Sequence, residues 1–282
     1  QTAFRVSNNK LFGVAAPAIF LHDSRKSYLT LGFLNSKIVT YLLSILNPTL
    51  NVLTGDIMNL PLIFSEQQNE KLKQTTQKLI DNSKADWDSY EISWDFQSNA
   101  LVSGHRVGYE LSNKNYSLRE AYSIWQKGKS HIIVEMQRLE TENNSLFIDA
   151  YGLQDELMPD VPLEQITLTA NPKYRYGGKL SDDVLNNRFQ SDTLAELISY
   201  AIGCMMGRYS LDREGLVYAH AGNEGFNDLV EEGAYNTFPA DDDGIIPLTD
   251  QEWFEDDVTL RFREFVQTVW GKDNLQANLD FV

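Results

Sequence analysis

The segment that most constrains the fold is an apolar run, residues 29–46, which is interrupted once by Asn35, Ser36 and Lys37. We expect Ser36 or Asn35 to cap a helix that ends before Pro48, because the residue before a proline is disfavoured in the helical conformation. The sequence therefore predicts a helix in a domain core, with a structural role for the three polar residues. Its apolar side chains recur at the spacing of one helical face: Ile38, Val39, Leu42, Leu43 and Leu46.

The polar interruption also argues against a membrane span, although the run is nearly long enough for one. The single cysteine, Cys204, excludes a disulfide framework and favours a reducing, cytoplasmic environment. Gln1 starts neither an initiator sequence nor a signal peptide, so the chain is interpreted as a piece of a longer protein. No metal site is expected, because no histidine has a second histidine or cysteine at ligand spacing: His22, His105, His131 and His220.

The formal net charge of -16 is distributed unevenly along the chain. Residues 1–64 carry five bases and two acids, a net charge of +3. Residues 228–282 carry fourteen acids and three bases, a net charge of -11. The beginning of the chain is therefore the more suitable part for contact with nucleic acid, and its end is strongly acidic.

The expected fold class is α+β, mainly helical. Residues 11–20 are predicted as strands broken at Pro17, and residues 147–151 as a short strand or an extended docking segment. Capping boxes predict helices beginning at Ser65, Ser117, Thr193 and Thr249. These elements divide the chain into the end of a mixed α/β domain (1–64), a spacer helix (65–86) and a helix-rich C-terminal domain with a few short strands (87–282), whose acidic tail region is 228–282.

Several phrases of the sequence are distinctive beyond their periodicity: Leu31–Lys37, Gly55–Pro61, Phe147–Leu157, Asn171–Gly178, Ile198–Asp212, Glu252–Asp257 and Arg261–Phe265. The first two resemble the end of a target-recognition domain of restriction-modification enzymes. All seven motifs together resemble the BREX phage-defence adenine-specific DNA methyltransferases, the phage-growth-limitation X proteins, over nearly the whole chain. The resemblance implies a large bacterial protein with an amino-terminal methyltransferase domain that uses S-adenosylmethionine, followed by target-recognition and helical regions. It places residues 1–64 at the end of the target-recognition domain.

The catalytic motifs of such an enzyme are not found in this sequence. Asn47-Pro48-Thr49 and Asn171-Pro172-Lys173 lack the second proline and the aromatic residue of a flipped-base loop. Gly177-Gly178-Lys179 lacks the spacing of a phosphate-binding loop. The acid pairs Asp182-Asp183 and Asp256-Asp257 are assigned to the first turns of helices, where the helix dipole stabilises them. We therefore expect no catalytic residue and no cofactor in this chain, and S-adenosylmethionine is expected in the missing catalytic domain.

Two functions remain open. The first is a non-catalytic DNA target-recognition and clamp portion, whose partners are double-stranded DNA and the missing methyltransferase domain. The second is a scaffold whose acidic surface docks other defence-system proteins. The DNA-binding candidates are the basic and aromatic residues near Gly177 and Gly178 and the cations at the start of the chain: Lys173, Tyr174, Arg175, Tyr176, Lys179, Arg5, Lys10, Arg25 and Lys26. Local ion pairing with Asp182 and Asp183 is the alternative role of the first group.

Overall fold

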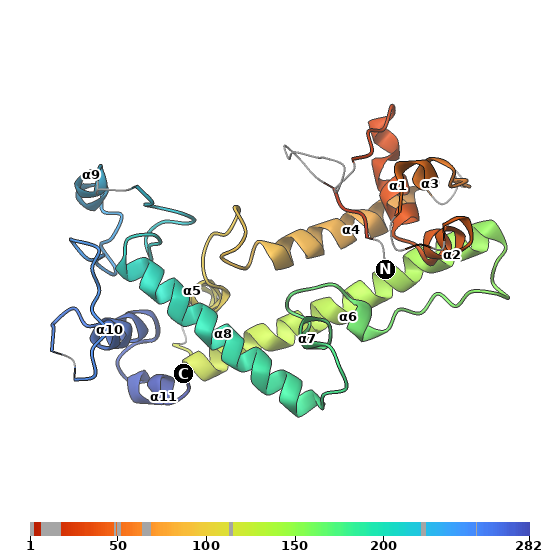
Figure 1. Cartoon of the computed structure of the whole chain (residues 1–282). Coiled ribbons are helices and arrows are strands. Elements are labelled where there is room, and N and C mark those ends of the chain that lie inside the picture. Colours follow the sequence, from red (N-terminus) through yellow and green to blue (C-terminus); the bar gives the residue numbers. More distant parts are fainter. Residues whose placement is uncertain are drawn as a thin grey trace. The chain divides into compact units, whose positions relative to one another are not determined.

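The computed structural model describes residues 3–6, 18–47, 49, 52–63, 69–112, 115–220, 224–251 and 253–282. Every regular element within these ranges is a helix (Figure 1). The predicted α+β class is therefore wrong for the described part of the chain, in which no strand occurs. Residues 147–151, predicted as a strand, are the last turns of a long helix. Of the strands predicted over residues 11–20, residues 18–20 are not in a strand and residues 11–17 lie outside the described residues, as does the capping box at Ser65.

The α-helices are α1 (Ser27–Leu34), α2 (Lys37–Leu46), α3 (Thr54–Met58), α4 (Asn69–Trp87), α5 (Ala100–Ser112), α6 (Leu118–Tyr151), α7 (Pro172–Tyr176), α8 (Asp182–Met205), α9 (Phe226–Glu231), α10 (Val258–Trp270) and α11 (Leu275–Leu279). Two short 3₁₀ helices are η1 (Ser24–Lys26) and η3 (Leu163–Gln165). The chain forms two compact units. Unit 1 comprises residues 1–84 and 132–174, and unit 2 comprises residues 85–131 and 175–282. The three predicted domain ranges remain a prediction.

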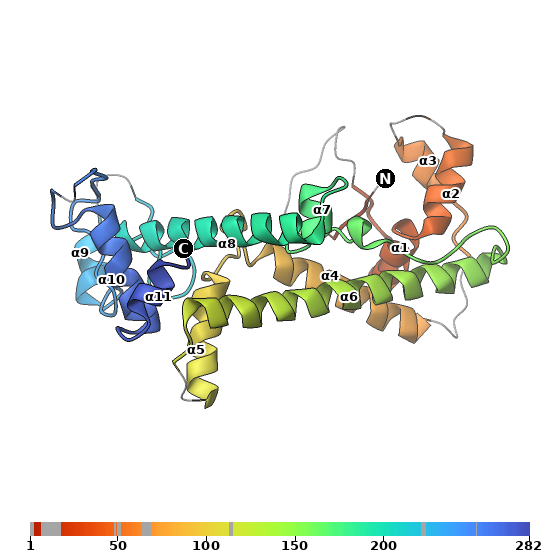
Figure 2. The same ribbon diagram turned by 90° about the horizontal axis from the view of Figure 1, so that it is seen from below.

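The core of unit 1 is built by α1, α2, α4 and the second half of α6. Phe33 and Ile38 are buried against Leu72 of α4 and Phe147 of α6. Residues 152–170 run back along α6, as the green segment of Figures 1 and 2 shows. They cover a second apolar cluster, which consists of Ile133, Met136, Val161, Ile166 and Leu168. Phe147 and Ile148 extend the buried face of α6, so tertiary packing explains why this short apolar run is helical.

The polar interruption at 35–37 separates α1 from α2, and all three residues make structural contacts. Ser36 occupies the N-cap position of α2, as predicted, but its side chain accepts no capping hydrogen bond. Its hydroxyl donates instead to the carbonyl oxygen of Phe33, at 2.7 Å. The Lys37 N–H donates to Oδ1 of Asn144 on α6, at 2.9 Å. The predicted capping mechanism is therefore wrong, because a residue distant in sequence supplies the cap.

The core of unit 2 is formed by α5, the beginning of α6, α8, α10 and α11. Its largest buried side chains include Trp270, Tyr200, Phe265 and Leu118. The capping box at Ser117 is confirmed, since the Ser117 N–H donates to Glu120 Oε2 and the Glu120 N–H donates to Ser117 Oγ.

Two other helix starts in unit 2 differ from the prediction. α8 begins at Asp182, so Thr193 lies inside the helix, where its hydroxyl donates to the Phe189 carbonyl. Ser181 caps α8, and Asp182 and Asp183 occupy its first turn as predicted. α10 begins at Val258 rather than near Thr249. A buried residue, Asp257, is its N-cap and accepts from Thr259 and Thr249, because the loop brings Thr249 back to the helix start.

None of the described helices is both long and apolar enough to cross a bilayer alone. Residues Ser24–Leu34 and Lys37–Leu46 reach the necessary length and hydropathy only as a pair, and they are bent by 72° relative to each other.

Candidate functional site

The predicted DNA-binding residues at the start of the chain lie in unit 1. Arg25 and Lys26 belong to η1, and both are exposed. The Arg25 guanidinium pairs with Asp23 at 2.9 Å, which lowers the pKa of that carboxyl through the hydrogen bonds it receives from Arg25. Arg5 is also exposed, while Lys10 lies outside the described residues. These exposed cations are able to reach a ligand, although Arg25 already has an acidic partner.

The second predicted group, residues 173–179, is divided between the two units. Lys173 and Tyr174 belong to unit 1, and Tyr174 is exposed. Arg175, Tyr176 and Lys179 belong to unit 2. Lys179 follows two glycines with positive φ, 59° at Gly177 and 72° at Gly178, and is exposed. The cations of this group also differ in exposure, since Lys173 and Arg175 are half-buried and Lys179 is exposed.

Arg175 is held by carboxylates of α8. Its Nη2 lies 3.2 Å from Asp192 and 3.1 Å from Glu196, and its guanidinium lies 5.9 Å from the centre of the Tyr90 ring. The Tyr176 hydroxyl donates to Asp192 at 2.7 Å. Burial raises the pKa of Glu196, and Arg175 opposes this effect by its positive charge. Arg175 is therefore ion-paired and Tyr176 hydrogen-bonded within unit 2, and their acidic partners are Asp192 and Glu196, not the predicted Asp182 and Asp183.

A more deeply buried ion pair also lies in unit 2. Nζ of Lys129 lies 3.6 Å from Oδ1 of Asp86, and both side chains are largely buried. Burial lowers the pKa of Lys129, while the charge of Asp86 raises it. The ring of Trp125 and a carboxylate partner fix this lysine inside the fold. We therefore assign it a structural role.

The two units differ strongly in net charge. This difference is not evident from the order of the sequence, because each unit combines two separate segments of the chain. Unit 1 contains eleven bases and thirteen acids, a net charge of -2. Unit 2 contains thirteen bases and twenty-seven acids, a net charge of -14. Within unit 1, residues 1–84 carry nine bases and five acids, a net charge of +4. Contact with a polyanion is therefore electrostatically favoured for unit 1 over unit 2.

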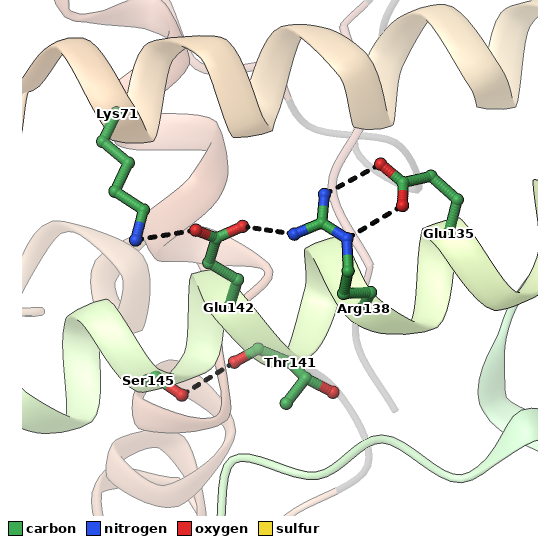
Figure 3. Close-up of polar contacts among 6 residues, drawn as sticks. All are labelled: Lys71, Glu135, Arg138, Thr141, Glu142 and Ser145. Carbon is green, nitrogen blue, oxygen red and sulfur yellow. Dashed lines mark hydrogen bonds and ion pairs between the residues drawn. The ribbon is translucent and has the colours of Figure 1, made fainter.

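Part of this charge comes from α4, whose cations belong to none of the predicted sites. Lys73 and Lys78 are exposed on this helix. Lys71 pairs with Glu142 of α6 at 2.7 Å, and Glu142 also binds Arg138, which in turn binds Glu135 (Figure 3). This chain of charges connects α4 to α6. These lysines lie in the segment that the sequence predicted only as a spacer helix, and its polar composition was the one feature that pointed to them.

Described residues of unit 2 line two adjoining cavities that share Glu91 and Arg208. No group of three or more histidine, cysteine or acidic side chains with metal-binding geometry occurs among the described residues. Cys204 is buried, and burial raises the pKa of its thiol to about 12. The thiol therefore remains protonated at neutral pH and is not a nucleophile.

The chain is similar to part of two longer methyltransferases. It is 45% identical over 274 residues to the adenine-specific methyltransferase BrxX of Escherichia coli O9:H4 (strain HS). It is 34% identical over 274 residues to the adenine-specific methyltransferase PglX of Lacticaseibacillus casei (strain Zhang). No protein-family model matches the chain. Each alignment covers 96% of this chain, but only 21% of BrxX and 20% of PglX. The chain is therefore homologous to about one fifth of the BREX adenine-specific methyltransferases, which confirms the resemblance that its sequence motifs carry.

Proposed function

We propose that this chain is a non-catalytic, DNA-contacting portion of a site-specific adenine-N6 DNA methyltransferase of a bacterial anti-phage system. The observation that carries the proposal is the charge separation between the units, together with the names of the two relatives. Unit 1 is the DNA-contacting part. Unit 2 is the acidic part that holds unit 1 in the larger enzyme and faces its protein components. The cytoplasm, where bacterial DNA lies, is the proposed location.

The contact proposed for unit 1 is with the phosphate backbone. Arg25 and Lys26 extend from η1, and Lys73 and Lys78 extend from α4, all as exposed cations. Exposed lysine and arginine side chains neutralise phosphates and position a protein on the duplex without reading its sequence. The polar residues 35–37 are engaged in contacts within unit 1. We therefore propose a clamp, and base reading by residues 35–37 is not part of it.

Methyl transfer is assigned to another part of the longer enzyme. The sequence has neither a glycine-rich cofactor turn nor an Asn-Pro-Pro-aromatic loop. S-adenosylmethionine is expected to bind outside this chain. Calorimetry should detect no heat of binding when this cofactor is added to the chain, and micromolar binding would contradict the assignment.

The salt dependence of duplex binding tests the DNA contact. Each phosphate contact contributes about 0.9 to the slope of log affinity against log salt concentration. The double variant Arg25→Ala/Lys26→Ala, and separately Lys73→Ala/Lys78→Ala, should each flatten this slope by up to about 2. Fluorescence anisotropy of a labelled duplex at several salt concentrations measures the slope.

The matched control removes two exposed lysines of unit 2, Lys127→Ala/Lys272→Ala, and therefore changes the net charge by the same amount. Its slope should stay within about 0.5 of the parent value, because neither lysine meets phosphate. An equal flattening in the control would place the DNA on unit 2. If the unmodified chain shows no salt-dependent binding to duplex DNA, the DNA contact is contradicted and the alternative function, a scaffold that docks other proteins, is favoured.

A further inference from the structure

Two open cavities adjoin one another in unit 2 and share Glu91 and Arg208. The larger has a volume of about 790 Å³ and the smaller about 260 Å³. Described residues that line the larger one include Ile198 and Ile202 of α8, together with Tyr218, His220 and Asp243 from the loops that follow. The smaller one is lined by Ile92, Trp94, Phe96, Tyr209 and Leu216. We call the two cavities together the Glu91 groove.

The rim of the Glu91 groove exposes large apolar side chains to water. The relative exposure is 103% for Trp94, 65% for Ile92, 62% for Leu216 and 50% for Met206. All four line one or the other cavity. Contiguous exposed apolar surface around a concave site is typical of a binding surface, and exposed tryptophan is a frequent anchor in protein interfaces.

Glu91 lines both cavities, and one of its carboxylate oxygens is buried without a well-placed donor. Glu91 Oε2 accepts a long hydrogen bond, 3.4 Å, from the hydroxyl of Ser199. The other oxygen, Oε1, is buried and has no donor at good hydrogen-bonding geometry among the described residues, and the Tyr209 hydroxyl is the other polar group that interacts with this carboxylate. Burial raises the pKa of Glu91, although the Ser199 hydrogen bond and the charge of Arg208 oppose this effect. A buried acceptor without a donor is costly, so a ligand that donates to it gains binding free energy.

The charges around the groove specify the sign of that ligand. Asp243 lines the larger cavity together with Glu91, within a unit whose net charge is -14. A lysine or arginine side chain has the charge complementary to these two carboxylates. Arg208 lies on the shared wall and supplies a donor for a carbonyl oxygen beside the cation. A peptide carries both groups next to each other, whereas duplex DNA would place phosphates against the acids.

We propose that the Glu91 groove docks an extended peptide segment of another protein, in which one lysine or arginine stands beside a large apolar side chain. The cation binds Glu91 and Asp243, and the apolar side chain lies against Trp94, Ile92 and Leu216. This surface belongs to unit 2 and does not depend on the proposed DNA contact of unit 1.

Selection of a display library of random peptides on the whole 282-residue chain tests this inference. Enriched peptides should carry a basic residue next to an aromatic or aliphatic one. Glu91→Gln removes only the charge, and Trp94→Ser removes a fully exposed ring, so neither should unfold the chain. Each should weaken binding of an enriched peptide by roughly tenfold or more in anisotropy titrations.

The matched controls are Glu255→Gln and Trp253→Ser, which change an exposed acid and an exposed tryptophan of unit 2 outside the groove. They should change the affinity by less than about twofold. Far-UV circular dichroism verifies that all four variants are folded. The inference is overturned if no peptide is enriched, if the enriched peptides lack a basic residue, or if the groove variants bind them as well as the controls do.

Discussion

Nδ2 of Asn143 on α6 donates a 2.9 Å hydrogen bond to the carbonyl oxygen of Gly32 on α1. The helices approach so closely here that a Cβ on Gly32 would lie 2.8 Å from Asn143 Oδ1 and 2.9 Å from Thr76 Oγ1 of α4. Gly32 is therefore the point at which three helices of unit 1 meet. The glycine of the Leu-Gly-Phe-Leu phrase has a packing role.

Gly32→Ala should consequently lower the free energy of unfolding by about 1–3 kcal/mol, because a methyl group overpacks the contact. Gly128 lies inside α6 and is exposed, and a Cβ added to it would have no other atom within 4 Å. Gly128→Ala should therefore stabilise the chain by up to about 1 kcal/mol through helix propensity. Denaturant titration measures both changes, and a loss in both variants would refute the packing argument.

The cap of α2 provides a second prediction. Asn144 is buried, accepts from the Lys37 N–H and donates to the Pro159 carbonyl at 3.0 Å. Asn144→Ala should cost about 2 kcal/mol, because it leaves a helix N–H and a carbonyl without partners. Ser36→Ala should cost less than about 1 kcal/mol, since its hydroxyl only donates to the preceding turn. If both variants lose the same free energy of unfolding, the Ser36 side chain contributes to the cap of α2 as much as Asn144 does.

Glu140 should make the stability of unit 1 depend on pH. This carboxyl is partly buried on α6, and burial raises its pKa to about 7. The folded state therefore keeps a proton that the unfolded state has lost, and stability falls as pH rises from about 4.5 to about 7. The total loss should be at most about 3 kcal/mol.

The variant Glu140→Gln isolates this effect. It should match the parent near pH 4 and be more stable than the parent at pH 8, because glutamine has no proton to lose. Denaturant midpoints at both pH values provide the measurement. Glu135→Gln, which removes a carboxylate paired with Arg138, is the control and should show no such gain at pH 8.

Arg175 is predicted to contribute to stability and not to DNA affinity. Arg175→Ala leaves Asp192 and Glu196 without their shared cation and should cost about 1–2 kcal/mol, discounted for their partial exposure. Lys179→Ala, at an exposed position nearby, should stay within about 0.5 kcal/mol. Neither variant should flatten the salt slope of duplex binding. A flattened slope with unchanged stability in Arg175→Ala would return this residue to the DNA interface.

Features that depend on neighbouring residues could be predicted from the amino-acid sequence. The helical spacing of residues 38–46 predicted a helix, and its buried face includes Ile38, Val39 and Leu43, which were named for it. The capping box at Ser117 was readable because its two members stand three residues apart. The family motifs were equally readable, and the two relatives confirm them.

Contacts between groups that are far apart in the chain became visible only in the folded structure. The cap of α2 comes from Asn144, 107 residues after Lys37, and the partners of Arg175 lie on a different helix, α8. The apolar run at 147–151 was predicted as a short strand or an extended docking segment, and this was wrong, because the run continues α6 and packs against Phe33. Periodicity reports which side of an element is apolar. It does not report which other element covers that side, because this depends on the loops that bring remote segments together.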